Sequence, residues 1–147
     1  ERVVNASFDD VAVTSRTDEP RDQEVQALGQ VLELLAECTE EGRLARAQKL
    51  AAKVTCQVAE DELIIAAVAN YNVVVDVENR RIQHGCRDFQ GQARKLCLCK
   101  HVAATLLALE PNRALLIARE LANGAQPVSG VVAAWRLEVI TRFRLGG

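Results

Sequence analysis

Apolar residues recur at a spacing of three and four in two neighbouring segments near the start of the chain, which predicts two helices. The first helix begins at Asp22, whose carboxylate can cap the free N–H groups of the first turn, and its apolar face includes Leu28. The second helix follows Gly42 and runs to about Lys53. We therefore predict a helical hairpin over residues 23–57.

The segment before this hairpin, residues 1–22, is polar and acidic, and Pro20 closes it. Its only candidate for regular structure is a short edge strand between Val3 and Val13. We expect these residues to form an acidic tail.

The pattern changes from helical to strand-like after Val54. Residues 63–69 are rich in Ile, Val and Ala, and residues 71–77 alternate so that Tyr71 and the valines two, four and six positions later share a face. A polar turn separates them from a third short strand at 82–85. The three segments together predict an antiparallel β-meander.

Helical segments then complete the chain. One helix is predicted over 101–109, a second begins at Pro111, and a last one begins at Pro127 with a wide apolar stripe that contains Trp135. The fold class is therefore α+β: a small antiparallel meander that leads into a helix, between an N-terminal helical hairpin and C-terminal helices over 111–147.

Composition narrows this picture. Aromatic residues make up 3% of the 147 residues and Met is absent, so the core must be aliphatic. No apolar run approaches the length of about 18 residues that a transmembrane helix requires. The start lacks a signal-peptide pattern, and five cysteines cannot all pair, which favours an intracellular protein without a disulfide framework. Cys38 and Cys56 lie in apolar patterns, and we expect both to be buried.

Charge is distributed unevenly along the chain. Residues 1–41 carry eleven acidic residues and three arginines, a net charge of −8, whereas residues 78–101 have a net charge of +4. The basic groups of this second segment are Arg80, Arg81, Arg87, Arg94, Lys95 and Lys100. They either contact phosphates or a partner's acidic surface, or merely keep a loop in solution.

Both histidines and three of the cysteines lie in the same basic segment. His84 and Cys86 are spaced i, i+2 at the end of a strand, so both can face one ion. Cys99 and His101 repeat that spacing where a helix begins, and the helix N-terminus favours a thiolate. Two cysteines and two histidines suit one tetrahedral zinc ion, and four protein ligands indicate a structural rather than a catalytic site. Cys97 offers an alternative set in which it replaces His84.

These residues resemble a SWIM zinc finger. The family pattern is Cys-x-Cys, a variable gap, then Cys-x-His, and here His84 stands where the family has its first cysteine. The Tyr/Val-rich strand at 71–77, the Asp88-Phe89 pair and Cys99-Lys100-His101 with the helix after it also match. The resemblance implies a SWIM-type zinc-binding module at 58–110.

The resemblance further implies a protein that binds DNA or other proteins. Small SWIM proteins act in recombinational repair with RecA-family paralogs, so our first hypothesis is a zinc-stabilised adaptor of that kind. In this hypothesis Trp135 either anchors a partner protein or packs in the core. The second is a protein scaffold or substrate-recognition module without nucleic acid, using the acidic helix region 22–41. The third, a thiol enzyme using Cys97, lacks a base because metal occupies both histidines, so we expect no enzyme.

Overall fold

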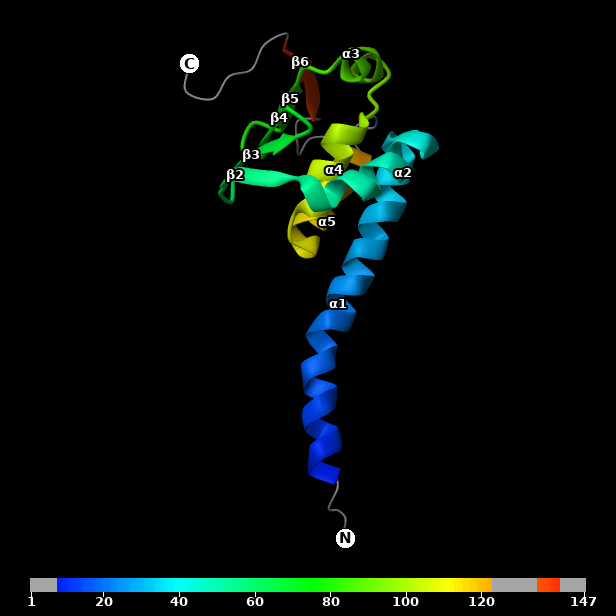
Figure 1. Cartoon of the computed structure of the whole chain (residues 1–147), viewed down its shortest axis with the longest axis vertical. Helices are drawn as coiled ribbons and strands as arrows, with labels where there is room; N and C mark the ends of the chain where they lie inside the picture. The colour runs from blue at the N-terminus through cyan, green and yellow to red at the C-terminus, as the bar shows by residue number, and fades with distance from the viewer. Residues whose placement is uncertain (1–7, 123–134, 141–147) are drawn as a thin grey trace, which may run out of the picture.

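The computed structural model describes residues 8–122 and 135–140, with side chains from residue 22 onward. The N-terminal part consists of α1 (Phe8–Cys38), α2 (Glu41–Leu50) and one turn of 3-10 helix, η1 (Ala51–Lys53). Both predicted helices are therefore confirmed. The C-terminal part of α1 packs on α5 (Pro111–Ala122), while its N-terminal part extends away from the sheet (Figure 1).

The start of α1 differs from the sequence prediction. We expected a tail up to residue 22 and, within it, a strand reaching Val13, but the helix begins at Phe8 and continues through Pro20. That expectation used Pro20 as the boundary between tail and helix, because proline lacks the N–H that a hydrogen bond inside a helix needs; the fixed φ of proline is nevertheless compatible with a helix, and here the helix continues through it. Residues 1–7 lie outside the described part of the chain.

Five strands in the described residues form one sheet in the order β2-β3-β4-β5-β6 (Figure 1). They are β2 (Thr55–Ala59), β3 (Leu63–Val68), β4 (Tyr71–Asp76), β5 (Arg81–His84) and β6 (Arg136–Val139). Antiparallel pairing of β3 with β4 and of β4 with β5 confirms the predicted meander. The edge strand β2 was missed, because most of its residues are exposed and it has no apolar alternation; it occupies part of the range predicted as helical hairpin.

Two turns set the register of the meander. Ala69 and Asn70 both have positive φ, 50° and 69°, which is the backbone of a two-residue hairpin turn between β3 and β4. In the next turn the buried carboxylate of Asp76 accepts hydrogen bonds from the backbone and side chain of Asn79 and from Arg81 Nε. These bonds fix the start of β5, which carries His84.

The last strand corrects the predicted C-terminal helix. Residues 136–139 form β6, which pairs in parallel with β5, and Ile140 N–H donates to the His84 carbonyl oxygen at 2.9 Å. Trp135, expected on an apolar helix stripe, is buried ahead of this strand, and its indole N–H donates to Glu120 at 2.9 Å. The other parts of that helix, at 127–134 and 141–147, lie outside the described residues.

Three described helices follow the meander: α3 (Arg87–Arg94), α4 (Lys100–Ala108) and α5. The helices expected over 101–109 and from Pro111 are confirmed, whereas α3 lies between Cys86 and Cys99, where we predicted no helix or strand. α4 packs on β3 and β4 and also against α2, so it is the central helix of the fold. The core is aliphatic, as composition predicted, and Phe89 is its largest fully buried side chain. No described helix has both the length and the apolar character needed to cross a membrane.

Gly85 permits the close approach of β6 to β5. A Cβ at this position would collide with the carbonyl oxygen of Ile140. We expect Gly85→Ala to lower the free energy of unfolding by about 1–3 kcal/mol, measured by urea denaturation, because the backbone of β6 must shift.

Gly91→Ala is the matched control, because a Cβ there meets nothing within 4 Å and Gly91 lies inside α3. The control should be stabilised by about 0.4–1 kcal/mol. Equal stability of Gly85→Ala and the wild type would show that β6 does not dock on β5 in this way.

Candidate metal centre

Four side chains from three elements converge beyond the end of β5. His84 is the last residue of β5, Cys86 is the N-cap of α3, Cys99 is the N-cap of α4, and His101 lies in the first turn of α4. Their ligand atoms all lie within 4.8 Å of one another, and all four residues are buried. The structure therefore brings together the two pairs favoured by their spacing, although Cys86 lies beyond the strand rather than on it.

The hydrogen bonds of His84 fix which of its nitrogen atoms faces the cluster. Its Nδ1 lies 2.7 Å from the Asn72 carbonyl oxygen, which only accepts, so Nδ1 carries the proton and Nε2 presents a lone pair. That Nε2 is 3.3 Å from His101 Nδ1. Donation from one imidazole nitrogen to a backbone carbonyl is the usual outer support of a metal-binding histidine.

The two cysteines occupy equivalent places at helix N-termini, where free N–H groups and the helix dipole favour negative charge. Phe89 N–H donates to Cys86 Sγ at 3.3 Å. A hydrogen bond from the Cys99 thiol lowers the pKa of Cys86, and the same interaction together with burial raises the pKa of Cys99. A cation between the two sulfur atoms removes this opposition, because it favours the thiolate form of both.

Aromatic rings enclose the two histidines. The Phe89 ring lies edge-on to His84 at a centroid distance of 5.4 Å. The Tyr71 ring covers the opposite region, 4.9 Å from the His101 ring and 5.6 Å from the His84 ring. The sequence pattern included both residues through the family resemblance, but their contacts with the two histidines follow only from the fold.

The donor set and spacing fit a tetrahedral zinc ion. In a tetrahedron with zinc–nitrogen distances of about 2.0–2.1 Å, the two nitrogen atoms stand about 3.3 Å apart. The nitrogen atoms of His84 and His101 are 3.3 Å apart. Two sulfur and two nitrogen ligands close the coordination sphere, as in structural zinc sites. The site can therefore hold a metal ion. That this ion is zinc stays a prediction.

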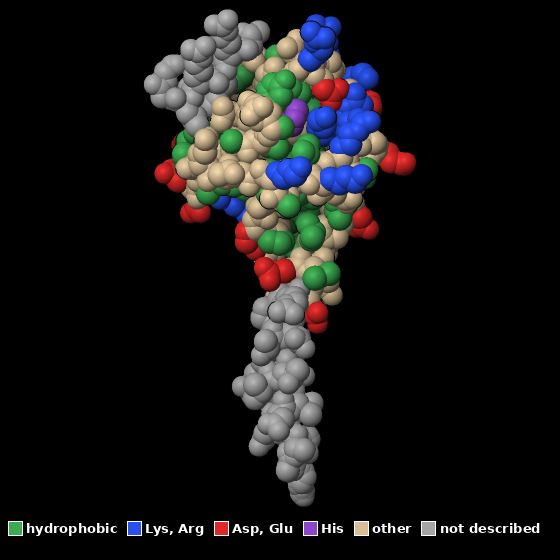
Figure 2. Space-filling view, in the orientation of Figure 1, with side chains coloured by type: hydrophobic (Ala, Val, Ile, Leu, Met, Phe, Trp, Pro, Cys, Tyr) green, Lys and Arg blue, Asp and Glu red, His purple; other side chains and the backbone are tan. Residues whose placement is uncertain are grey.

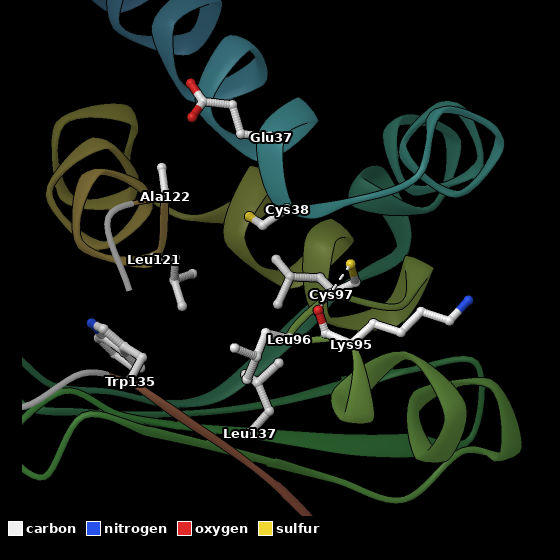
Figure 3. A pocket seen from close by; sticks show the side chains of 10 residues that line it. Glu37, Cys38, Lys95, Leu96, Cys97, Leu121, Ala122, Trp135 and Leu137 are labelled. Atoms are coloured by element: carbon white, nitrogen blue, oxygen red, sulfur yellow. Dashed lines mark hydrogen bonds between the residues drawn. The ribbon is translucent and has the colours of Figure 1, made fainter. Parts of the chain in front are cut away.

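Cys97 lies outside this cluster. Its Sγ faces the Lys95 carbonyl oxygen at 3.6 Å, and the residue lines a pocket with Cys38 and Trp135 (Figure 3). The alternative set that replaces His84 by Cys97 is not the one the structure assembles. Cys38 is buried as predicted, and burial raises the pKa of its thiol to about 11. The predicted burial of Cys56 was wrong, because β2 is an exposed edge strand.

The basic residues selected from the sequence separate into two groups. Arg80 binds Glu120 through two hydrogen bonds, Arg81 contacts Asp76 at 3.0 Å, and Lys95 lies 3.5 Å from Glu40. Within the described residues, no ion pair involves Arg87, Arg94 or Lys100. The first group is held by acidic neighbours, and the second is available to an anion.

A second source of positive charge is α2, which packs against α4. Arg46 and Lys49 on α2 and Lys53 on η1 are exposed. Arg43 instead links α2 to α3, with two hydrogen bonds of 2.8 and 2.7 Å to the Asp88 carboxylate, and these bonds lower the pKa of Asp88. The spacing of these basic residues opposite the apolar face is visible in the sequence, but their position beside the metal centre is not.

No protein-family model matches the chain, and neither a curated protein nor a solved structure matches it.

The cluster makes the ligand set directly testable. Cys86→Ser and His101→Ala should each abolish stoichiometric metal binding, whereas Cys97→Ser should keep one metal ion per chain. Metal-loaded wild type should unfold cooperatively, and a strong chelator should remove that transition, because structural zinc contributes on the order of 10–16 kcal/mol against a domain stability of about 5–15 kcal/mol. Metal content and thermal unfolding are the measurements.

Cys56→Ser is a further control, since that thiol is exposed on β2. Loss of metal in Cys97→Ser would return Cys97 to the ligand set. An unchanged melting curve after chelation would show that the cluster does not stabilise the fold through a metal.

Proposed function

We propose that this protein is a zinc-stabilised, non-enzymatic adaptor that binds DNA, and that it acts in recombination or repair with a RecA-family paralog. The observation that carries the proposal is a buried cluster of four ligands directly beside a surface rich in Lys and Arg (Figure 2). The donor set supports a closed structural ion, and the adjoining charges support a polyanionic partner.

The zinc ion, when bound, would supply structural cross-linking and no chemistry on a substrate. His84 and Cys86 would hold it from the end of β5 and the start of α3, and Cys99 and His101 from the start of α4. Because α2 packs on α4, these ligands would also help to fix the position of Arg46 and Lys49 on α2. A stable metal centre thereby keeps the phosphate-binding groups in fixed relative positions.

The ion pairs in the structure change the set of basic residues that we assign to the phosphate-binding surface. Arg80, Arg81 and Lys95 are engaged by Glu120, Asp76 and Glu40, so we leave these three residues out of that surface. The surface that would contact phosphates, called the basic face below, comprises Arg87, Arg94, Lys100, Arg46, Lys49 and Lys53. Such contacts are independent of base sequence and release counterions, so they give affinity that depends strongly on salt.

The proposal of a RecA-family partner is supported by the resemblance of residues 58–110 to the SWIM pattern. The second candidate function is a protein scaffold or substrate-recognition module that does not bind nucleic acid, and one observation favours it. Val25 on α1 and Leu116 on α5 have exposed fractions of 63% and 62%, and these helices pack together away from the basic face. Trp135 is not available as an anchor, because it is buried.

DNA affinity of the metal-loaded protein should fall by about 10- to 1,000-fold between 50 and 200 mM salt, because several phosphates are neutralised. Lys49→Gln and Lys100→Gln should each weaken binding and reduce the slope of log affinity against log salt by about one unit. Fluorescence anisotropy with a labelled oligonucleotide measures both quantities.

Arg119→Gln is the matched control, because Arg119 is an exposed arginine on α5, outside the basic face. It should leave affinity unchanged. An affinity that does not vary with salt, or an equal loss in Arg119→Gln, would contradict phosphate binding by the basic face.

Affinity purification of the tagged full chain from its native host should recover a RecA-like ATPase. Val25→Glu should reduce that recovery if α1 forms the contact, whereas Lys49→Gln should not. Recovery of unrelated proteins, together with no shift of DNA, would instead favour the second candidate function.

A further inference from the structure

Tyr71 is an exposed aromatic residue at the metal centre. It begins β4, directly after the two-residue turn at Ala69 and Asn70, and its exposed fraction is 43%. The side chain is not part of the core, and no described hydrogen bond engages its hydroxyl group. A large exposed ring therefore stands where the fold gives it no internal role beyond covering two histidines.

The ring is held rigidly from one side. It rests on His101 at a centroid distance of 4.9 Å with an angle of 38° between the planes, and it lies edge-on to His84 at 5.6 Å. Both histidines are buried, and His84 is fixed by its hydrogen bond to the carbonyl of Asn72, the neighbour of Tyr71. One side of the Tyr71 ring thus has a fixed support, while the rest is open to solvent.

The ring also lies close to the start of α4, where the basic face includes Lys100. In Figure 2, histidine atoms reach the surface beside a group of Lys and Arg side chains. His101, against which the Tyr71 ring lies, is 6% exposed. Lys100 is the chain neighbour of His101 in the first turn of α4, and the structure shows no ion pair for it among the described residues. The Tyr71 ring therefore lies against the chain neighbour of Lys100, which is one of the cations of the basic face.

An aromatic ring beside a track of cations is the arrangement by which proteins bind single-stranded nucleic acid, because unpaired bases stack on the ring while cations contact the phosphates. We propose that Tyr71 is a base-stacking residue of a single-stranded DNA site whose phosphates lie on the basic face. This inference rests on the proposed DNA binding and adds the form of DNA that the site selects. A duplex hides the faces of its bases, so duplex binding would use the basic face alone.

The test compares Tyr71→Leu with the wild type on a labelled single strand and on the blunt duplex of the same sequence. Leucine keeps apolar cover over His101 but offers no π-face. Affinity for the single strand should fall by about 5- to 100-fold, the range expected on loss of one base–aromatic stack, while duplex affinity stays unchanged. Metal content is measured in every variant and should remain at the wild-type value.

Two further variants sharpen the result. Tyr71→Phe keeps the ring and should bind the single strand like the wild type. Leu116→Ala removes a comparably exposed apolar side chain from α5 and should change neither affinity. Wild-type affinity of Tyr71→Leu for the single strand, or an equal loss on both forms of DNA, would overturn base stacking while leaving DNA binding intact. Failure of the wild type to bind either form would instead overturn the proposed function.

Discussion

Two thiols and two imidazoles are buried within 4.8 Å of one another, and together they can hold one metal ion. The hydrogen bond between the two thiols lowers the pKa of Cys86 and raises the pKa of Cys99, because two adjacent buried thiolates would repel each other. A divalent cation offsets this repulsion and converts all four groups into ligands. An ion at this site would hold the end of the sheet against two helices, because the ligands come from the end of β5 and from the starts of α3 and α4.

The position of this cluster suits it to hold the small sheet against the helices that follow it. The exposed edge strand β2 contributes little buried apolar surface, and the chain has few aromatic residues to fill a core. A metal that ties β5 to α3 and α4 would supply the missing constraint, and the Arg43–Asp88 pair extends it to α2. The same arrangement sorts the basic residues. Arg80 and Arg81, near the β4–β5 turn, meet acidic neighbours, while Arg46 and Lys49 on α2 are exposed.

Sequence spacing predicted the ligand cluster well, because i, i+2 pairs at the end of a strand and at the start of a helix leave little freedom. The meander and the helices at α1, α2, α4 and α5 were also predictable from periodicity. The errors have separate causes. Trp135 and its neighbours match an apolar helix stripe, yet residues 136–139 pair with β5, since backbone pairing with a distant strand outweighs local pattern. The helix α3 was missed because it is short and polar, and its N-cap is a cysteine rather than a usual capping residue.

The sequence by itself determined the aliphatic core, the α+β class, the four candidate ligands and the concentration of positive charge around them. These properties depend on residue type and on spacing over a few positions. Only the tertiary structure decided that Cys97 lies outside the cluster, that Tyr71 covers His101, and that Arg80 and Arg81 are held by acidic residues while α2 adds cations. Each of these depends on contacts between residues far apart in the chain, which local periodicity does not encode.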